Sequence, residues 1–249
     1  MILVLGGTSE ARELATLLDA AAARFMSSLA GRVARPRLPV GAVHVGGFGG
    51  VSGLRAFLLE YRVTAVVDAT HPFAQGMTAN AVAACTADGV PLLRLERPGW
   101  SEAPGAGGWE WVDDHDAAAA AAARLGERPF LTVGRQPLGH FAGPLAEHRT
   151  LVRAVDQPDI TFPETWTLVL SRGPYPLDEE RALFEEHDVD VVVTKDSGGS
   201  YTWSKLQVAA ERGASVVVVR RGPRPYGVDV VSDPRAAADW AKAIDGGGR

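Results

Sequence analysis

Residues 2–12 read ILVLGGTSEAR. Four consecutive apolar residues predict a strand at Ile2–Leu5, and the residues after the glycine pair have the pattern of a helix that starts at Ser9. The glycines permit a tight turn, while free amides and the positive end of the helix dipole favour a phosphate at this point. The stretch therefore predicts the strand, turn and helix that open a parallel α/β sheet.

The glycine turn matches the dinucleotide fingerprint G-x-G-x-x-G/A in part. Gly6 and Ala11 fit its first and third positions, but Thr8 stands where the second glycine is expected. Two interpretations stay open, a nucleotide-binding turn or a plain strand-to-helix connection in which Thr8 or Ser9 caps the helix.

Strand-like and helical stretches alternate along the whole chain, which is typical of a mostly parallel sheet with helices on both faces. Strands are expected at Ile2–Leu5, Arg24–Ser28, Ala42–Val45, Ala65–Asp68, Pro91–Leu95, Trp109–Val112, Phe130–Val133, Leu151–Val155, Thr167–Leu170, Val189–Thr194, Ser215–Val219 and Asp229–Val231. Helices are expected at Ser9–Ala22, Ser52–Tyr61, Ala74–Asp88, Asp116–Leu125, Asp178–Glu186, Ser204–Arg212 and Asp233–Ile244.

The segment Gly126–Pro129 follows an alanine-rich helix and precedes a new strand, so we expect the domain boundary there. The fold class is α/β, with two Rossmann-like lobes, residues 1–128 and 129–249, whose mostly parallel sheets face a central cleft. Ligands of such sheets bind beyond the carboxyl ends of the strands, so the informative residues should follow strands directly.

Composition excludes several classes of protein. The chain of 249 residues is 46% hydrophobic with a formal net charge of −5, and it has no basic block for nucleic acid. Cys85 is the only cysteine, which excludes an internal disulfide and a multi-cysteine metal site and predicts a buried apolar role; no metal is expected. No apolar run approaches the ~20 residues of a membrane span, and the first strand opens almost at the initiator methionine, so we expect a cytoplasmic protein.

Residues that follow two of the predicted strands indicate which nucleotide the protein binds. The second strand is followed by no acidic residue that would hold the ribose hydroxyls of NADH; Ser28 and Arg32 stand there instead and favour the 2′-phosphate of NADPH. A solvated loop position for Arg32 is the alternative. Gly47 lies in a dense glycine cluster, residues 46–50, which we expect to pack against the cofactor.

The stretch DATHPFA at residues 68–74 follows an apolar strand and enters a helix. His71 precedes a proline, which favours an extended backbone at the helix entrance, and it could donate to a substrate carboxylate or a cofactor phosphate. In the alternative interpretation Asp68 and His71 satisfy one another and cap the helix.

Several motifs together resemble one family, the precorrin-6A reductases, including those that reduce cobalt-precorrin-6A. They are GGTSEAR at residues 6–12, AGR at 30–32, GGFGG at 46–50, DATHPFA at 68–74, TVGR at 132–135, SRGPY at 171–175, TKDSGG at 194–199, Lys205 with Ala209 and Ala210, and VVRRGP at 218–223. The chain departs from the family at residues 221–223, where we expect an arginine followed directly by proline.

The resemblance implies a two-lobed fold and reduction of one carbon–carbon double bond of a tetrapyrrole macrocycle in cobalamin biosynthesis, with NADPH as hydride donor and precorrin-6B as product. It also implies a precorrin substrate and leaves neighbouring pathway enzymes as candidate partners. The cofactor-binding residues are then Gly6, Gly7, Thr8, Ser9, Glu10, Ser28, Arg32, Gly47 and Thr70.

A precorrin is a polycarboxylate, so guanidinium and ammonium groups should recognise it. Residues of the second lobe stand at or after predicted strand ends or around a glycine loop. The candidate substrate-binding residues are His71, Arg135, Arg172, Lys195, Ser197, Gly198, Tyr201, Lys205 and Arg220. A solvated surface position for each cation, and ordinary packing for Tyr201 and Trp203, are the alternatives.

The proton donor stays open among Asp68, His71, Lys195, Asp196, Tyr201 and bound water, with Lys195, Asp68 and His71 as the catalytic candidates. Two other functions are compatible with part of the pattern. A dinucleotide sensor without catalytic activity would not need the cationic set, and a short-chain carbonyl reductase would use the Tyr201-x-x-x-Lys205 spacing on one helix face.

Overall fold

The computed structural model describes residues 1–31 and 37–246, and these divide into two compact units. Unit 1 comprises Met1–Pro98 and Gly222–Arg249, and unit 2 comprises Gly99–Arg221. Each unit contains one six-stranded sheet, and the neighbouring strands of the described residues pair in parallel. The predicted α/β class with two parallel sheets is confirmed.

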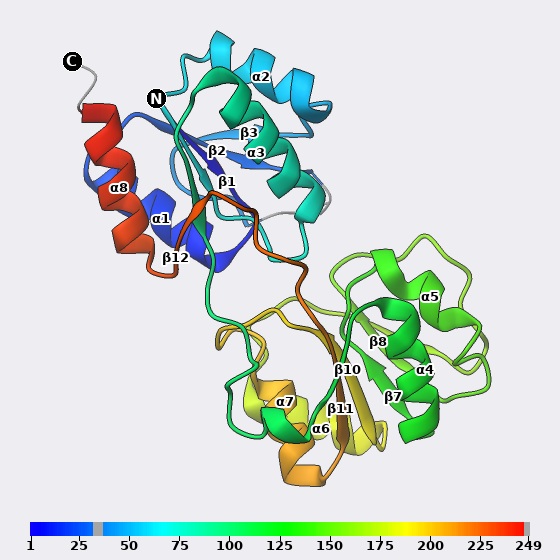
Figure 1. Ribbon diagram of the computed structural model, residues 1–249. Helices are drawn as coiled ribbons and strands as arrows, with labels where there is room; N and C mark the ends of the chain where they lie inside the picture. The colour runs from blue at the N-terminus through cyan, green and yellow to red at the C-terminus, as the bar shows by residue number, and fades with distance from the viewer. Residues whose placement is uncertain (32–36, 247–249) are drawn as a thin grey trace. The chain divides into compact units, whose positions relative to one another are not determined.

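Unit 1 is built from the two ends of the chain (Figure 1). Its elements are β1 (Ile2–Leu5), α1 (Ser9–Ala20), β2 (Phe25–Leu29), β3 (Ala42–Val45), α2 (Gly50–Glu60), β4 (Ala65–Asp68), α3 (Gln75–Asp88), β5 (Leu92–Leu95), β12 (Asp229–Val231) and α8 (Pro234–Gly246). The strand order is β12-β5-β4-β1-β2-β3.

Unit 2 is formed by the middle of the chain. Its elements are β6 (Glu110–Val112), α4 (His115–Leu125), β7 (Pro129–Leu131), α5 (Gly139–Ala142), β8 (Leu151–Ala154), β9 (Thr167–Leu170), α6 (Leu177–Glu186), β10 (Val191–Lys195), α7 (Ser204–Arg212) and β11 (Ser215–Val219), with short 3₁₀ helices η1 (Ala106–Gly108) and η2 (Gln136–Leu138). The strand order is β6-β11-β10-β7-β8-β9.

The boundary expected at residues 128/129 lies inside unit 2. β6 and α4 belong to the second sheet rather than the first, and β12 and α8 return to the first sheet. Gly126–Pro129 is only the connection from α4 to β7. Both sheets have the order 3-2-1-4-5-6 when the strands are numbered within each sheet, with β12 as the sixth strand of unit 1 and β6 as the sixth strand of unit 2. Each sixth strand comes from the other half of the chain, and nothing in the local sequence marks this exchange.

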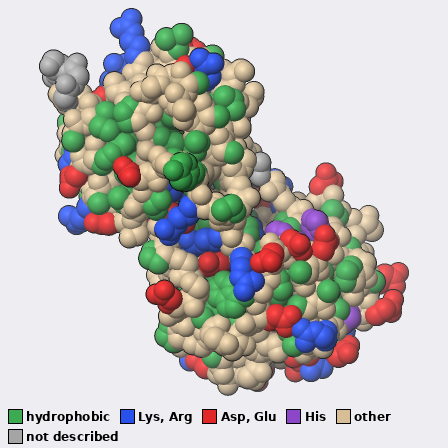
Figure 2. All heavy atoms as spheres, viewed as in Figure 1, with side chains coloured by type: hydrophobic (Ala, Val, Ile, Leu, Met, Phe, Trp, Pro, Cys, Tyr) green, Lys and Arg blue, Asp and Glu red, His purple; other side chains and the backbone are tan. Residues whose placement is uncertain are grey.

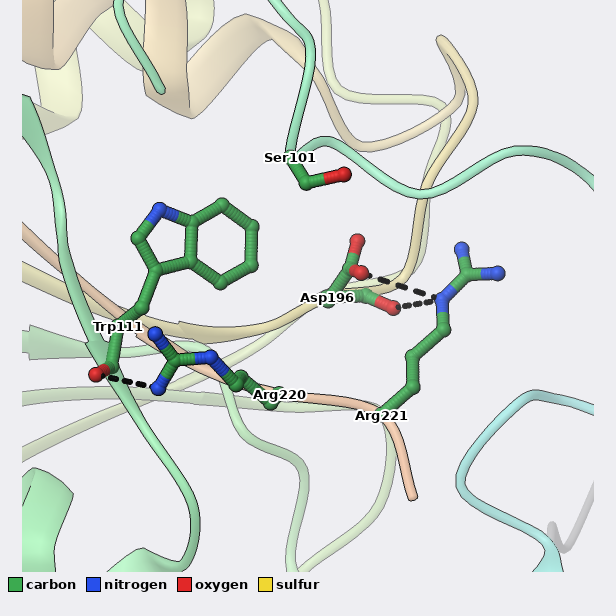
Figure 3. A pocket seen from close by; sticks show the side chains of 5 residues that line it. All are labelled: Ser101, Trp111, Asp196, Arg220 and Arg221. Atoms are coloured by element: carbon green, nitrogen blue, oxygen red, sulfur yellow. Dashed lines mark hydrogen bonds and ion pairs between the residues drawn. The ribbon is translucent and has the colours of Figure 1, made fainter. Parts of the chain in front are cut away.

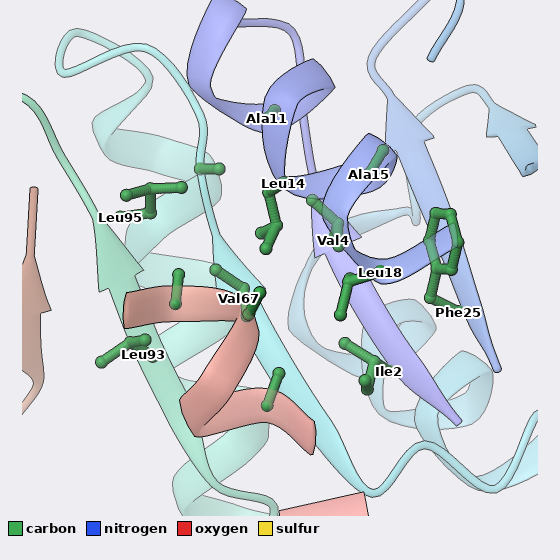
Figure 4. Close-up of a cluster of buried hydrophobic side chains, with 14 residues drawn as sticks. Ile2, Val4, Ala11, Leu14, Ala15, Leu18, Phe25, Val67, Leu93 and Leu95 are labelled. Carbon is green, nitrogen blue, oxygen red and sulfur yellow. The ribbon is translucent and has the colours of Figure 1, made fainter. Parts of the chain in front are cut away.

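The central strand of the unit 1 sheet, β1, is apolar at every position and is buried on both faces. In β1, Ile2 and Val4 pack with α1 and α8, whereas Leu3 and Leu5 pack with α2 and α3. Figure 4 shows the first of these clusters, where Leu14 and Leu18 of α1 lie over the strands. A continuous apolar run is the pattern expected of a parallel strand covered on both faces.

Cys85 lies in the second cluster of unit 1, on α3. It is buried, as the sequence predicts, and burial raises the pKa of its thiol to about 12. A thiol with so high a pKa is an inert packing group at neutral pH.

Two surveys of the described residues bear on membranes and metals. No helix among them is long and apolar enough to span a bilayer. No group of three or more His, Cys, Asp or Glu side chains in this part of the chain is arranged to hold a metal ion.

Candidate functional site

The strand order places a switch point in each sheet. In unit 1 the chain moves from β1 toward β2 on one side and returns to β4 on the other, and in unit 2 it does the same around β7 and β10. Ligands of doubly wound sheets bind beyond the carboxyl ends of the two strands at such a point. The loops after β1 and β4, and after β7 and β10, are therefore the candidate sites.

The loop after β1 has the geometry of a phosphate cradle. A Cβ at Gly6 would lie 3.3 Å from the carbonyl oxygen of Ser28, so this glycine packs closely against β2. Gly7 has φ +116°, and nothing lies within 4 Å of the place where its Cβ would be. α1 starts just beyond, at Ser9, and the free backbone amides of a helix N-terminus favour an anion.

The side chains of this loop are used within unit 1. The Thr8 hydroxyl donates to the carbonyl of Ala69 at 2.7 Å and accepts from the amide of Ala11 at 3.1 Å, so Thr8 is the N-cap of α1. Glu10 accepts from Ser9 Oγ and pairs with Arg97 at 2.7 Å. The contacts of Thr8 and Glu10 with a cofactor stay predictions, and their side chains already have partners within unit 1.

The remaining candidates around the nucleotide loop lie at neighbouring strand ends. Ser28 is buried on β2, with its carbonyl accepting from the amide of Gly6 at 2.8 Å. Gly47 follows β3, and nothing lies within 4 Å of its Cβ position. Arg32 falls outside the described residues, so its contact with a 2′-phosphate stays a prediction.

Asp68 lies at the end of β4 in a buried network that the sequence did not predict. Its Oδ1 accepts from the amide and hydroxyl of Thr70 and pairs with Arg94 Nη1 at 2.8 Å, and its Oδ2 accepts from Thr78 Oγ1 at 2.6 Å. Arg94 also donates to both oxygens of Thr70 and pairs with Glu96. Asp68 and Arg94 are 1% and 2% exposed, so they form an internal anchor for the loop after β4.

This placement argues against two earlier interpretations. A carboxylate that is buried and has both oxygens occupied is poorly suited to give a proton to a substrate, so the contacts of Asp68 favour a positioning role for it, and its catalytic role stays a prediction. The partners of Asp68 are Arg94, Thr70 and Thr78, not His71 as in the capping alternative. His71 is partly exposed, and its Nδ1 accepts from the amide of Phe73 at 3.2 Å. Its roles in catalysis and substrate binding stay predictions.

Lys195 ends β10, at the switch point of unit 2. Its Nζ would lie 3.8 Å from a Cβ at Gly134, which follows β7 and has φ +80°. Burial lowers the pKa of Lys195 to about 8. The structure thus brings Lys195 to the glycine turn that precedes Arg135, an exposed residue at the start of η2.

His115 also lies near this edge, and sequence reasoning missed it. It opens α4 and stacks on His140 with ring centroids 5.7 Å apart, while its Nε2 is buried without a partner among the described residues. Burial, followed by the positive charge of Lys195, lowers the pKa of His115. The one signal for it in the sequence is its place three residues after the sixth predicted strand.

The other predicted substrate residues are spread along the same edge of unit 2. Ser197 and Gly198 follow β10, where the Ser197 amide donates to the carbonyl of Lys195 at 2.6 Å and Gly198 has φ +67°. Arg172 follows β9 and is partly exposed. Tyr201 is 37% exposed and precedes α7, and Arg220 directly follows β11.

The position of Lys205 differs from the prediction. It was expected to reach substrate, but its side chain is 4% exposed; Nζ donates to the carbonyl of Thr202 at 2.6 Å and lies 5.1 Å from the ring centroid of Trp100. The buried Arg153–Glu180 ion pair is close to it. Lys205 therefore stabilises the loop before α7 through its hydrogen bond to Thr202. Tyr201 lies outside that helix, so the two residues do not form the helical pair of a short-chain reductase.

The stability of the protein should depend on pH through Lys205. Burial, with a smaller contribution from Arg153, lowers the pKa of Lys205 from 10.5 to about 7. Between these values the unfolded chain binds a proton that the folded protein does not, so the free energy of unfolding should rise with pH across this window. In urea unfolding, the free energy of unfolding of Lys205→Met should rise less between pH 7 and pH 9 than that of the wild-type protein. The pKa of Lys195 is also lowered, but Lys195 contributes equally in the two proteins. Identical pH dependence would contradict this placement.

Comparisons with known proteins agree with these features. The family model for "Precorrin-6x reductase CbiJ/CobK" matches residues 1–242. The chain is 48% identical to precorrin-6A reductase of Rhodococcus erythropolis and 46% identical to that of Mycobacterium tuberculosis H37Rv, each over 98% of both chains. A solved structure, "CobK precorrin-6A reductase", superposes with a TM-score of 0.89 at 36% identity and covers 98% of this chain and 96% of its own.

Both sheets, the glycine loops at their switch points and full-length identity of this order lead to one assignment. The chain belongs to the precorrin-6x reductase CbiJ/CobK family.

Proposed function

We propose that this protein reduces one carbon–carbon double bond of the precorrin-6A macrocycle with NADPH and gives precorrin-6B. The observation that carries the proposal is the 48% identity over 98% of both chains to a protein named precorrin-6A reductase. Five relatives with that name are 38–48% identical to this chain, and three relatives named cobalt-precorrin-6A reductase are 26–31% identical. The metal-free macrocycle is therefore the proposed substrate.

The loop after β1 fits a dinucleotide. Gly7 leaves open space where a side chain would otherwise stand, and α1 presents its N-terminus there. The nicotinamide supplies the hydride when it is bound. The end of β2 carries Ser28, and the sequence that follows has Arg32 and no acid, which favours a 2′-phosphate and hence NADPH.

Unit 2 would hold the substrate by its carboxylates. Lys195 and Arg135 lie at the switch point of that sheet, and Arg172 and Arg220 follow two of its other strands. Because the pKa of Lys195 is about 8, its ammonium is protonated at neutral pH and still acidic enough to release a proton. Lys195 is thus our first candidate both for binding a carboxylate and for completing the reduction.

Replacing Lys195 with methionine should lower kcat/KM for precorrin-6A by roughly 10- to 100-fold, because a charge-assisted contact contributes about 1.5–3 kcal/mol. The affinity for NADPH should stay within about twofold, since the nucleotide loop is in unit 1. A rise in KM alone would mark a carboxylate ligand, and a fall in kcat would mark the proton donor.

Lys242→Met is the matched control. Lys242 is an exposed residue of α8 and pairs with Asp239, so its replacement should change neither kcat/KM for precorrin-6A nor the affinity for NADPH. Unchanged kcat/KM in the Lys195 variant would remove this residue from the substrate site.

A further inference from the structure

Residues 196–203, which we call the β10–α7 loop, read DSGGSYTW and follow Lys195 at the switch point of the unit 2 sheet. The loop carries three of the predicted substrate residues, Ser197, Gly198 and Tyr201. Gly198 and Gly199 both have φ +67°. Glycine loses more conformational entropy on ordering than any other residue, so a loop with two consecutive left-handed glycines needs contacts from elsewhere to keep one conformation.

Trp100 supplies two of these contacts from the start of unit 2. Its backbone amide donates to Asp196 Oδ1 at 2.9 Å, and its indole Nε1 donates to the carbonyl oxygen of Gly199 at 2.9 Å. The two hydrogen bonds therefore hold the first residue of the loop and its glycine turn. Trp100 is only 3% exposed, and a hydrogen bond that is shielded from water is stronger than one at the surface.

Packing fixes the Trp100 ring itself. Its centroid lies 6.1 Å from that of Trp203, at the end of the loop, and 5.1 Å from Lys205 Nζ. The ring belongs to the core cluster that also contains Leu206 of α7. Lys205 in turn donates to the carbonyl of Thr202 at 2.6 Å. Two buried side chains, Trp100 and Lys205, thus bond the loop at three separate residues.

Gly99 leaves room for the carboxylate at the start of the loop. A Cβ at this position would lie 2.5 Å from Asp196 Oδ2, so a larger residue would have to displace that side chain. The carbonyl oxygen of Asp196 accepts from Arg221 Nε at 2.9 Å, and Oδ2 lies 3.3 Å from the same nitrogen (Figure 3). Asp196 also borders a shallow pocket of about 330 Å³, lined by Ser101, Trp111, Asp196, Arg220 and Arg221.

We propose that Gly99 and Trp100 are positioning residues that keep the β10–α7 loop in its substrate-binding conformation. Trp100 acts through Gly199, and Gly99 acts through Asp196. The inference rests on the proposed function, because it takes the tetrapyrrole substrate from there. A loop that is ordered before the substrate arrives spares the complex the entropy of ordering it. A loop that is ordered only part of the time weakens the apparent affinity in proportion.

Trp100→Phe in the full-length protein removes the indole donor and keeps an aromatic ring. KM for precorrin-6A should rise about three- to tenfold, because the Gly199 carbonyl loses its partner and the competent loop is less populated. The value of kcat should stay within about twofold, since saturating substrate orders the loop. The Kd of NADPH should not change, since the nucleotide loop is in unit 1.

Trp166→Phe is the matched control. Trp166 is 8% exposed, and its Nε1 donates to the carbonyl of Leu145 at 3.0 Å, so this variant also loses one buried indole hydrogen bond. Trp166 directly precedes β9 and therefore lies at the opposite edge of the same sheet from the β10–α7 loop. The control should lose stability to a similar extent and keep the wild-type KM.

Gly99→Ala tests the proposal independently, because it leaves the indole in place and does not depend on whether Trp100→Phe folds. The added Cβ should displace the carboxylate of Asp196 and raise KM for precorrin-6A. Gly143→Ala is its control. Gly143 follows α5 in the same unit with φ −72°, and nothing in the described part of the chain lies within 4 Å of its Cβ position, so KM should stay at the wild-type value.

Hydrogen–deuterium exchange of the peptide that covers residues 196–203 measures the loop without any activity. Exchange should be faster in Trp100→Phe than in the wild-type protein and unchanged in Trp166→Phe. Faster exchange with an unchanged KM would make Trp100 a structural residue only and overturn the proposal. If wild-type protein reduces precorrin-6A and both Trp100→Phe and Gly99→Ala keep its KM, the positioning role is overturned and the proposed function stands.

A binding probe covers the case in which wild-type protein does not reduce precorrin-6A and the proposed function fails. The probe is uroporphyrin, a tetrapyrrole with acetate and propionate groups, and its binding is followed by absorbance. Weaker binding in Trp100→Phe than in Trp166→Phe would then support the positioning role for a tetrapyrrole. Equal binding in the two variants would overturn it.

Discussion

Arg94→Met should lower the free energy of unfolding by about 3–5 kcal/mol, because it leaves buried carboxylates without their cation. Arg94 contacts Asp68 at 2.8 Å and Glu96 at 3.0 Å, and its own side chain and that of Asp68 are almost wholly buried. Its donors also bind both oxygens of Thr70. The variant removes all of these contacts at once, and the loop after β4 loses its anchor.

Urea unfolding at pH 7 measures this effect, with Arg55→Met as the control. Arg55 of α2 pairs with Asp88 at 2.7 Å, but its side chain is half-exposed. An exposed ion pair contributes at most about 1 kcal/mol, so the control should stay close to wild type. Equal losses in the two variants would mean that the Arg94 network is no stronger than a surface pair.

Gly7→Val should reduce the affinity for NADPH by more than roughly 100-fold while the protein remains folded. At Gly7 no atom lies within 4 Å of the Cβ position, so the protein leaves room for a Cβ there, but the branches of valine would occupy the space that a phosphate must enter. The φ of +116° adds backbone strain of about 1–3 kcal/mol, which the fold can tolerate. Calorimetric titration with NADPH, together with circular dichroism, measures both parts of the expectation.

Gly89→Val separates the contact with the cofactor from the backbone strain. Gly89 caps α3 in the same unit, has φ +65° and also has nothing within 4 Å of its Cβ position. This control should be strained like the Gly7 variant and still bind NADPH normally. Normal affinity in Gly7→Val, or an equal loss in Gly89→Val, would place the nucleotide elsewhere.

The strands of this fold could be predicted because parallel strands buried on both faces leave continuous apolar runs. Each predicted strand overlaps one in the structure, from Ile2–Leu5 to Asp229–Val231. The short α5 was missed because the Pro137–Gly139 region is typical of a turn. The partners of β6 and β12 could not be predicted, because an edge strand carries no local mark of the sheet that it joins.

The site was predicted in part for a similar reason. The glycine loop at residues 6–7 and the cation Lys195 follow strands, and topology alone brings such residues to a switch point. Arg94 was missed although an arginine inside the apolar strand Leu92–Leu95 is itself a signal of a buried ion pair. Lys205 was misplaced because the residues that surround its ammonium group, Trp100 and the Arg153–Glu180 ion pair, are distant in sequence. Figure 2 shows basic and acidic side chains interspersed on the visible surface, and only the packed chain reveals which cations are buried.

We propose that this protein is an NADPH-dependent reductase of precorrin-6A, and one assay tests this most directly. Purified protein should be incubated with precorrin-6A and either NADPH or NADH, following nicotinamide absorbance, the macrocycle spectrum and the mass of the product. The account predicts that one NADPH is oxidised for each macrocycle, that the product gains two hydrogens, and that NADH reacts more slowly. Precorrin-6A that stays unchanged with both cofactors, in protein that binds NADPH, would contradict it.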